Sequence, residues 1–434
     1  MQRSRILAGV TWLSMAAALL AGCGAKTGLD VPDANLDAGP DAGLDVGPRD
    51  AGTDVGLDAS IPCIVLEPDA GPVELPLDTQ VELGRADVVF LIDVTGSMSQ
   101  EIGHIQAELR DTIAPGISAA IPDSELGVAT FADFPVRACG TSEDHPYNLV
   151  LPVTNDLARV QTAVNTIGVS NGGDPPEAQV EALYQTVTGE GLGSFIASSF
   201  GCPEGGFGYA CFRNDALPVI LLFTDDYWHE GPGGRDPFSE DCPGLLSSVT
   251  PHVYADALGV LNARGVRVMG LFSGIDGGAR SELDRVATDT DAVDDGRPLV
   301  FDIGVHGEAL SSSVVEAITT LANVIRFDID TALVDPMPGD GVDPRDFVQA
   351  VTPLRAEPMD GVESIDVAAG VFRQVRTGTR VVFQLTLRNG SVAPGVGPQH
   401  FQLEIVFRGD RRTRIGSTII DIVVPGADGT GCPP

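Results

Sequence analysis

The segment of residues 88–99, VVFLIDVTGSMS, brings a carboxylate and two hydroxyls to the end of an apolar run. Asp93, Thr95 and Ser97 alternate along a short loop, so their side chains can converge on one point, and Gly96 lets the backbone come close. Carboxylate and hydroxyl oxygens, with no Cys or His among them, are suited to a hard cation such as Mg²⁺. The spacing therefore predicts a divalent-cation site.

Two further carboxylates are candidates for the same site. Glu177 lies in NGGDPPEA (171–178), and Asp225 ends the apolar run LPVILLFTD (217–225). A divalent ion would offset the repulsion among Asp93, Glu177 and Asp225. We expect Mg²⁺, with Mn²⁺ or Ca²⁺ as the alternatives.

Each of these residues also has a purely structural interpretation. Thr95 or Ser97 would serve as the cap of a following helix, although capping needs only one of them. Asp174 and Glu177 fit a D-x-x-E capping box. Asp225 would suit a solvated turn after a strand. These alternatives stay open at this point.

The elements around these residues alternate between strand-like and helix-like segments over residues 84–327. We expect strands near 86–94, 126–134, 217–225 and 266–274, and helices near 99–117, 155–168, 174–187, 250–265, 278–288 and 308–325. Asn155 or Asp156 is expected to cap one helix, and Gly265 to end another. The alternation predicts a doubly wound, mostly parallel α/β sheet of the Rossmann-like type. Inserts rich in Gly, Pro and Cys near 189–217 and 227–250 are expected to line the rim of the site.

Open α/β sheets bind ligands beyond the carboxyl ends of their strands, where Asp93 and Asp225 are expected to lie. Residues 84–327 resemble a von Willebrand factor type A domain, and DVTGSMS resembles its D-x-[ST]-x-S metal-ion-dependent adhesion site. The resemblance implies a Mg²⁺ or Mn²⁺ ion whose coordination is completed by a carboxylate of a bound protein. It implies that Asp93, Thr95 and Ser97 form the first loop and Asp225 the third, where Asp226 replaces the usual Gly. Glu177 is the candidate in the second loop, where many members have Thr.

The first 23 residues are expected to form a signal peptide, with arginines followed by an apolar segment. Their end, LAGC, resembles the lipobox of bacterial lipoproteins and implies lipidation of Cys23; Gly24 favours the outer membrane, with the chain facing the surface or the periplasm. The alternative is an ordinary signal peptide cut nearby. Residues 24–60 are rich in Asp, Ala, Gly and Pro, and we expect a disordered tether. A calcium-binding repeat is the alternative for this segment.

Six further cysteines form an even set, which in an exported chain predicts disulfides. Cys202 and Cys211 flank a Gly-rich loop and are the expected local pair. A Cys63–Cys432 bond would join the ends of the folded part, and Cys139 and Cys242 complete the set. A zinc site is the alternative, although no CxxC or cluster of His indicates one.

Residues 328–434 have a different pattern of short alternating strands separated by Gly, Asn and Pro, which predicts a small β-sandwich. The RGD at 408–410 and the Asn-Gly at 389–390 are both interpreted as hairpin turns. A recognition role for RGD and glycosylation of Asn389 are the alternatives. Arginines 408, 411, 412 and 414 are expected to be solvated or to pair with acidic groups of the chain.

The net charge of −35 disfavours nucleic acid as a partner. No HExxH, GxSxG, phosphate-loop or dinucleotide-binding pattern is found. We therefore expect a lipid-anchored adhesion or binding protein, not an enzyme, that engages an acidic group of a partner protein. The alternatives are a structural envelope lipoprotein and, last, an enzyme that uses the metal as a Lewis acid. The sequence does not indicate an oligomeric state.

Overall fold

The computed structural model describes residues 61–434 except 171, 174, 203–204, 239–241, 243, 340, 430 and 433–434. The signal peptide, Cys23, the tether and Asp174 therefore lie outside the described residues. None of the helices within the described ranges is long and apolar enough to cross a membrane.

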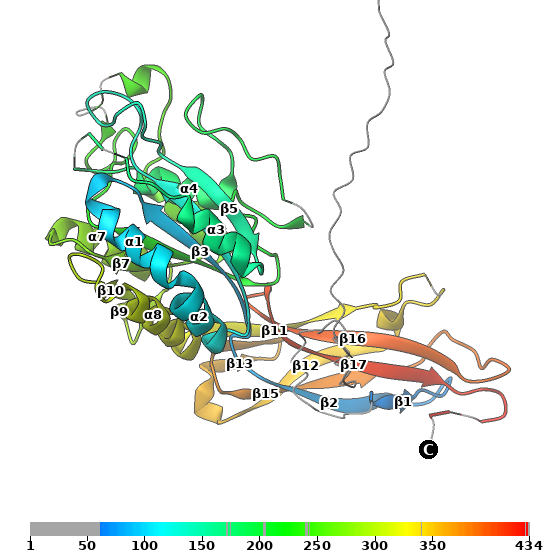
Figure 1. Ribbon diagram of the computed structural model, residues 1–434. Coiled ribbons are helices and arrows are strands. Elements are labelled where there is room, and N and C mark those ends of the chain that lie inside the picture. The colour runs from blue at the N-terminus through cyan, green and yellow to red at the C-terminus, as the bar shows by residue number, and fades with distance from the viewer. Residues whose placement is uncertain are drawn as a thin grey trace, which may run out of the picture. The chain divides into compact units, whose positions relative to one another are not determined.

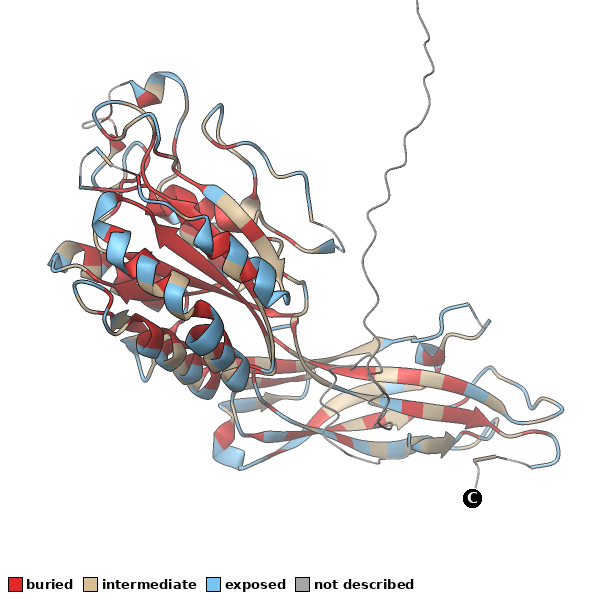
Figure 2. Cartoon of the chain, in the orientation of Figure 1, coloured by how far each residue is buried: buried red, intermediate tan, exposed pale blue. Residues whose placement is uncertain are grey.

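The centre of the α/β part is a six-stranded sheet in the order β10-β7-β6-β3-β4-β5 (Figure 1). Its strands are β3 (Arg85–Asp93), β4 (Asp123–Phe131), β5 (Asn148–Thr154), β6 (Leu217–Thr224), β7 (Arg267–Phe272) and β10 (Val300–Asp302). The first five strands in this order are parallel, and β5 pairs antiparallel at the edge. All residues of β6 and β7 are buried, which Figure 2 shows as continuous red strands. Continuous apolar runs such as LPVILLFT predict this, because helices cover both faces of a parallel sheet.

The helices of this part are α1 (Ser99–Glu108), α2 (Ala114–Ala120), α3 (Leu157–Asn165), α4 (Gln179–Thr188), α6 (Tyr254–Arg264), α7 (Gly277–Asp289) and α8 (Leu310–Val324). α1 contacts α3 and α8, and α2 contacts α8, whereas α4 packs on α6. The right-handed rule for parallel crossovers puts α6 and α7 on the face opposite to α1 and α2, and α4 is on the same face as α6, on which it packs. The expected doubly wound architecture is therefore confirmed.

Two of the expected helices differ in their bounds. The segment 99–117 is divided by a five-residue π-helical turn, η2 (Leu109–Ile113), between α1 and α2. The helix expected from residue 174 begins only at Gln179, because Glu177 forms an isolated parallel bridge with Trp228. Gly265 ends α6 in the left-handed conformation, as expected.

Asp156 is the cap of α3, because its carboxylate accepts hydrogen bonds from the backbone N–H groups of Ala158 and Arg159. We expect Asp156→Ala to lower the free energy of unfolding by about 1 kcal/mol, since two N–H groups of the first turn lose their acceptor. Urea unfolding of the full chain measures this. The neighbouring Asn155→Ala is the control, and an equal loss in both variants would contradict the assignment.

The β part is a sandwich, as predicted, of a six-stranded sheet in the order β1-β17-β16-β11-β14-β13 and a three-stranded sheet β12-β15-β2. Phe383 of the smaller sheet packs on Phe372 and Phe407 of the larger one, with ring centroids 5.0 and 5.8 Å apart. The strands are β1 (Cys63–Val65), β2 (Val73–Gln80), β11 (Arg326–Val334), β12 (Val348–Glu357), β13 (Ser364–Asp366), β14 (Val371–Arg376), β15 (Arg380–Leu387), β16 (Gln399–Gly409) and β17 (Thr413–Val424). The remaining short elements are strands β8 (Val293–Asp294) and β9 (Arg297–Pro298) and 3₁₀ turns η1 (Gly96–Met98), η4 (Leu245–Ser247), η5 (Pro344–Phe347) and η6 (Met359–Gly361).

The sandwich includes a segment that precedes the α/β part. β1 pairs with β17, and β2 pairs with β15, so residues 63–80 belong to the same two sheets as the C-terminal strands. A disulfide joins Cys63 to Cys432 and ties β1 to the end of the chain. The other two disulfides join Cys202 to Cys211 and Cys139 to Cys242.

The two turns expected in the β part have different outcomes. The RGD lies in a hairpin, since β16 ends at Gly409 and β17 begins at Thr413. The prediction of a hairpin at Asn389 is wrong, because β15 and β16 lie in different sheets. The Asn389 side chain instead accepts hydrogen bonds from the N–H groups of Ser391 and Val392 and donates to the Leu66 carbonyl. This local turn links strands of the two sheets.

Arginines of the 408–414 cluster pair with acidic groups of the chain. Arg408 forms a two-pronged ion pair with Asp330, with N–O distances of 3.0 and 2.8 Å, and Arg414 pairs with Glu404 at 2.5 Å. The Arg412 guanidinium donates to the Ala263 carbonyl. Arg408 and Arg414 therefore pair with acidic groups, whereas Arg412 bonds a backbone carbonyl.

Candidate functional site

The candidate site lies where two neighbouring strands end. β3 ends at Asp93 and β6 at Thr224, and the two strands are paired in parallel. The connection after β3 leads through α1 and α2 to β4, and the one after β6 leads through α6 to β7 on the other side. Connections that diverge in this way leave a crevice at the carboxyl edge, which is the usual ligand position in this class of sheet.

Asp93 is fully buried and held by three hydrogen bonds. Its Oδ1 accepts from the N–H and the Oγ1 of Thr95 at 2.9 and 2.8 Å, and its Oδ2 accepts from Thr224 Oγ1 at 2.8 Å. Burial raises the pKa of Asp93 to about 7, and the charge of Asp225 adds to the effect. A carboxylate so placed gains from a neighbouring positive charge.

Hydroxyl groups connect Asp93 to Asp225. Thr95 Oγ1 lies 3.3 Å from Ser97 Oγ, and Ser97 Oγ donates to Asp225 Oδ1 at 3.2 Å. Thr95 is buried and Ser97 is exposed, so the connection runs from the interior to the surface. Burial also raises the pKa of Asp225, against the opposing effect of the Ser97 hydrogen bond. The first and third predicted segments therefore meet.

Neither hydroxyl residue acts as a helix cap within the described part of the chain. Thr95 precedes η1 without a side-chain capping bond, and the residue that precedes α1 is Met98. The capping interpretation of these hydroxyls is wrong, because both side chains are directed into the connection between Asp93 and Asp225.

Glu177 is held at the same crevice by its backbone. Its N–H donates to the Tyr227 carbonyl at 3.0 Å, and its carbonyl accepts from His229 N at 2.8 Å. α4 begins two residues later with Ala178 before it, so Glu177 does not close a capping box at this helix. The bridge with Trp228 fixes the backbone of Glu177 independently of the helix.

The Glu177 carboxyl group is buried, and its Oε2 has no hydrogen-bond partner among the described residues. Burial raises its pKa to about 12, and the charges of Asp93, Asp133, Asp144 and Asp226 add to this. A buried carboxyl oxygen without a partner carries a free-energy cost that a bound cation would remove.

A pocket of about 370 Å³ lies between the three segments. Thr95, Ser97, Glu177 and Asp226 line it together with Gly96, Gly172, Gly173 and Pro175. Asp226, which follows Asp225 in place of the expected Gly, therefore faces the same pocket. Burial is the main cause that raises the pKa of Asp226 to about 6. Among the described lining residues the donor side chains offer oxygen and none offers nitrogen or sulfur, which fits a hard cation.

The three carboxylates do not form a closed cage. Among the described residues, a group of His, Cys, Asp and Glu side chains with ligand atoms within 4.8 Å of one another does occur, but none of these three carboxylates belongs to it. That group is described below. A cation here would therefore rely on the hydroxyls and on water as well as on the carboxylates, as Mg²⁺ commonly does.

Two supporting residues were not found from the sequence. Thr224 bonds Asp93, and the buried Gln179 donates to Thr224 Oγ1 at 3.1 Å and to the Asp226 carbonyl at 3.0 Å. Thr224 is a hydroxyl residue at the end of an apolar strand, directly before Asp225, and this position could have indicated a role at the site. Nothing in the sequence around Gln179, at the start of α4, indicates its contact with Thr224.

The backbone conformation at position 172 favours a glycine. It has φ +62°, and an added Cβ would lie 3.4 Å from Glu177 Oε1. We expect Gly172→Ala to lower the free energy of unfolding by about 1–2 kcal/mol because of the left-handed backbone. Urea unfolding measures the loss. Gly168→Ala is the control, because nothing lies within 4 Å of its added Cβ; a loss of the same size in both variants would contradict the reason given.

No protein-family model matches the chain. One similar solved structure is described as von Willebrand factor type A from Catenulispora acidiphila; it is 12% identical with a TM-score of 0.32, over 86% of this chain and 76% of that chain. Another is the pilus adhesin SpaC from Lactobacillus rhamnosus GG in its open conformation, which is 10% identical with a TM-score of 0.33. That match covers 82% of this chain and 46% of the adhesin chain. Values of this size assign neither a family nor a function, so the site has to be interpreted from its own geometry.

Proposed function

We propose that this chain is a non-enzymatic, lipid-anchored binding protein that holds a divalent cation, Mg²⁺ or Mn²⁺, at the carboxyl edge of the α/β sheet. Asp93, Thr95, Ser97, Glu177 and Asp225 would hold the ion as in a metal-ion-dependent adhesion site. A carboxylate of a partner protein would occupy an open coordination position. Cys23 would anchor the chain in the outer membrane, and residues 24–60 would act as a tether.

The observation that carries the proposal is the hydroxyl connection between two buried or half-buried carboxylates, Asp93 and Asp225, with the buried Oε2 of Glu177 at the same pocket. Carboxylates with raised pKa values are costly to keep ionised side by side, and a divalent cation compensates for that cost. Ser97 Oγ and the pocket are exposed, so a partner can reach the ion from solvent.

The first experiment is calorimetric titration of the metal-free full chain with Mg²⁺ and with Mn²⁺, combined with the melting temperature. We expect saturable binding and a higher melting temperature with either ion, because an ion that binds the folded chain stabilises it by mass action. No heat of binding together with an unchanged melting temperature would support the alternative, a structural envelope lipoprotein whose α/β part is a scaffold.

The second experiment concerns the partner. Proteins retained by the immobilised chain in Mg²⁺ are eluted with a chelator, and the same capture is made with Asp93→Ala. We expect the specific partner to be released by the chelator and absent from the variant. A partner that binds equally in both treatments would contradict a cation-mediated contact.

A further inference from the structure

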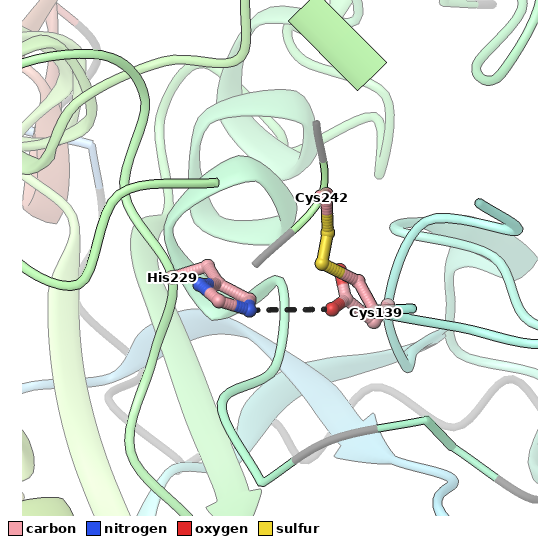
Figure 3. Close-up of side chains that lie close together, drawn as sticks. Cys139, His229 and Cys242 are labelled. Atoms are coloured by element: carbon pink, nitrogen blue, oxygen red, sulfur yellow. Dashed lines mark ion pairs between the residues drawn. A yellow bond between two sulfur atoms is a disulfide. The ribbon is translucent and has the colours of Figure 1, made fainter. Parts of the chain in front are cut away.

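A second group of metal-ligating side chains lies next to Glu177, whose carbonyl accepts a hydrogen bond from His229 N. Asp133, Cys139, His229 and Cys242 are all fully buried, and one ligand atom from each lies within 4.8 Å of the others. Figure 3 shows His229 beside the disulfide of the two cysteines, with the ion pair from its ring nitrogen to a carboxylate oxygen, that of Asp133, drawn as a dashed line. In the structure the two sulfurs are joined as a disulfide.

We propose that these four residues bind one Zn²⁺ ion when the Cys139–Cys242 disulfide is reduced. Two thiolates, an imidazole and a carboxylate form a tetrahedral S₂NO set, which suits zinc better than Mg²⁺ or Ca²⁺. In a tetrahedral zinc site the ligand atoms are about 3.3–3.8 Å apart, from bond lengths of about 2.0–2.3 Å. The observed grouping requires side-chain movements of about 1 Å to reach that geometry.

The orientation of His229 is already that of a metal ligand. Its Nδ1 lies 2.8 Å from the Asp236 carbonyl oxygen, which can only accept, so Nδ1 carries a proton. Nε2, the nitrogen that would bind the metal, faces Asp133 Oδ2 at 3.6 Å. Metal-bound histidines commonly have their other nitrogen bonded to a carbonyl or carboxylate in this way.

Asp133 is fixed in a similar manner. Its Oδ1 accepts a hydrogen bond from Phe134 N at 2.6 Å, which leaves Oδ2 on the side of His229. A disulfide is neutral and does not require a carboxylate and an imidazole beside it, and burying such groups is costly. A zinc ion bound by the thiolates would place a positive charge within reach of both the Asp133 carboxylate and the His229 ring.

Apolar side chains pack against the four residues. Phe134 and Phe238 pack edge to face with centroids 5.1 Å apart, and Phe238 also packs on the His229 ring at 4.3 Å. Cys139, Cys242 and Leu245 belong to the same small core. This shell shields the group from solvent and favours thiolate ligation in place of water.

Zinc binding follows reduction of the disulfide. A dithiol reduces the Cys139–Cys242 bond by two electrons and becomes a disulfide itself, which leaves two protein thiols. Zn²⁺ then binds both sulfurs and releases the two thiol protons to solvent. In the reverse direction a small-molecule disulfide takes two electrons from the two thiolates and becomes a dithiol, the Cys139–Cys242 bond forms again and Zn²⁺ is released, so the disulfide and the zinc complex are mutually exclusive.

The test uses Co²⁺ as a spectroscopic substitute for zinc, added to the reduced, metal-free full chain. We expect one Co²⁺ per chain with thiolate-to-cobalt charge transfer and the visible bands of tetrahedral coordination, and no charge transfer in the oxidised chain. The Cys139→Ser/Cys242→Ser variant should lose the signal. The Cys202→Ser/Cys211→Ser variant is the matched control and should keep it.

His229→Gln leaves all cysteines in place and covers the case in which the double variant does not fold. We expect it to weaken Co²⁺ binding at least about 10-fold. A folded, reduced wild-type chain without charge transfer, or a signal that persists without Cys139 and Cys242, would overturn the proposal. Asp93→Ala should leave the signal unchanged, so the result does not depend on the oxygen-ligand site.

Discussion

Asp93→Ala is expected to lower the affinity of the full chain for Mg²⁺ and Mn²⁺ at least about 100-fold. The substitution removes a buried carboxylate and the acceptor of the Thr95 and Thr224 hydroxyls, so the loop that ends at Ser97 loses its anchor. Loss of a residue that only orients a metal ligand typically lowers metal affinity about 10–100-fold. In the proposed site Asp93 both binds the ion and orients Thr95, so a larger loss is expected. Titration calorimetry of the variant measures the change.

The control for this prediction is Asp111→Ala, which removes an exposed carboxylate from η2 and the same amount of formal charge. Its affinity should match that of the wild type. Asp93→Asn separates charge from shape, because an amide can still bond Thr95 and Thr224. We expect Asp93→Asn to bind the ion as poorly as Asp93→Ala while melting at a higher temperature. Retention of wild-type affinity in Asp93→Asn would contradict a direct role of the charge.

The affinity for Mg²⁺ is expected to rise about tenfold per pH unit between pH 7.5 and 9. The pKa of Glu177 is about 12 in the cation-free chain, so this carboxyl group is protonated throughout that range and must lose its proton to coordinate the ion. The sign follows from the raised pKa: higher pH lowers the cost of deprotonation and strengthens binding. Below about pH 7, Asp93 is protonated as well, and the dependence becomes steeper.

Calorimetry at pH 8 in buffers of different ionisation enthalpy counts the released protons directly. We expect about one proton per Mg²⁺ ion in the wild type and nearly none in Glu177→Gln, whose affinity should not change with pH in this range. Glu181→Gln is unsuitable as a control because Glu181 bonds His252; the exposed Glu143→Gln is suitable. An affinity in the wild type that does not vary with pH would contradict the role assigned to Glu177.

The ends of β3 and β6 could be predicted from the sequence because both strands are buried on two faces. Such strands contain continuous apolar runs, and Asp93 ends the run of β3 while Asp225 directly follows β6. The sequence also indicated that Glu177 belongs to the site, but it did not indicate which residues hold its backbone there. Its backbone is fixed by Tyr227 and His229, about fifty residues further along the chain, and local sequence carries no information on that pairing.

The sequence also did not predict which strands form the sandwich. β2 pairs with β15 at Gln80 and Arg380, which are three hundred residues apart in the chain. Short alternating strands indicate that a β-sheet forms, but not which distant segment completes it. The Asn389 prediction failed for a related reason, since Asn-Gly favours a turn without specifying whether the flanking strands pair with each other.

The central claim is that one divalent ion lies among the three segments at the carboxyl edge of the α/β sheet. A crystal of the chain grown with Mn²⁺ tests it most directly, because anomalous scattering locates the ion independently of the protein atoms. We predict one strong peak bound by Ser97 Oγ, with Asp93, Thr95, Glu177 and Asp225 around it directly or through water. A fully occupied Mn²⁺ peak elsewhere in the crystal, with none at this pocket, would contradict the account.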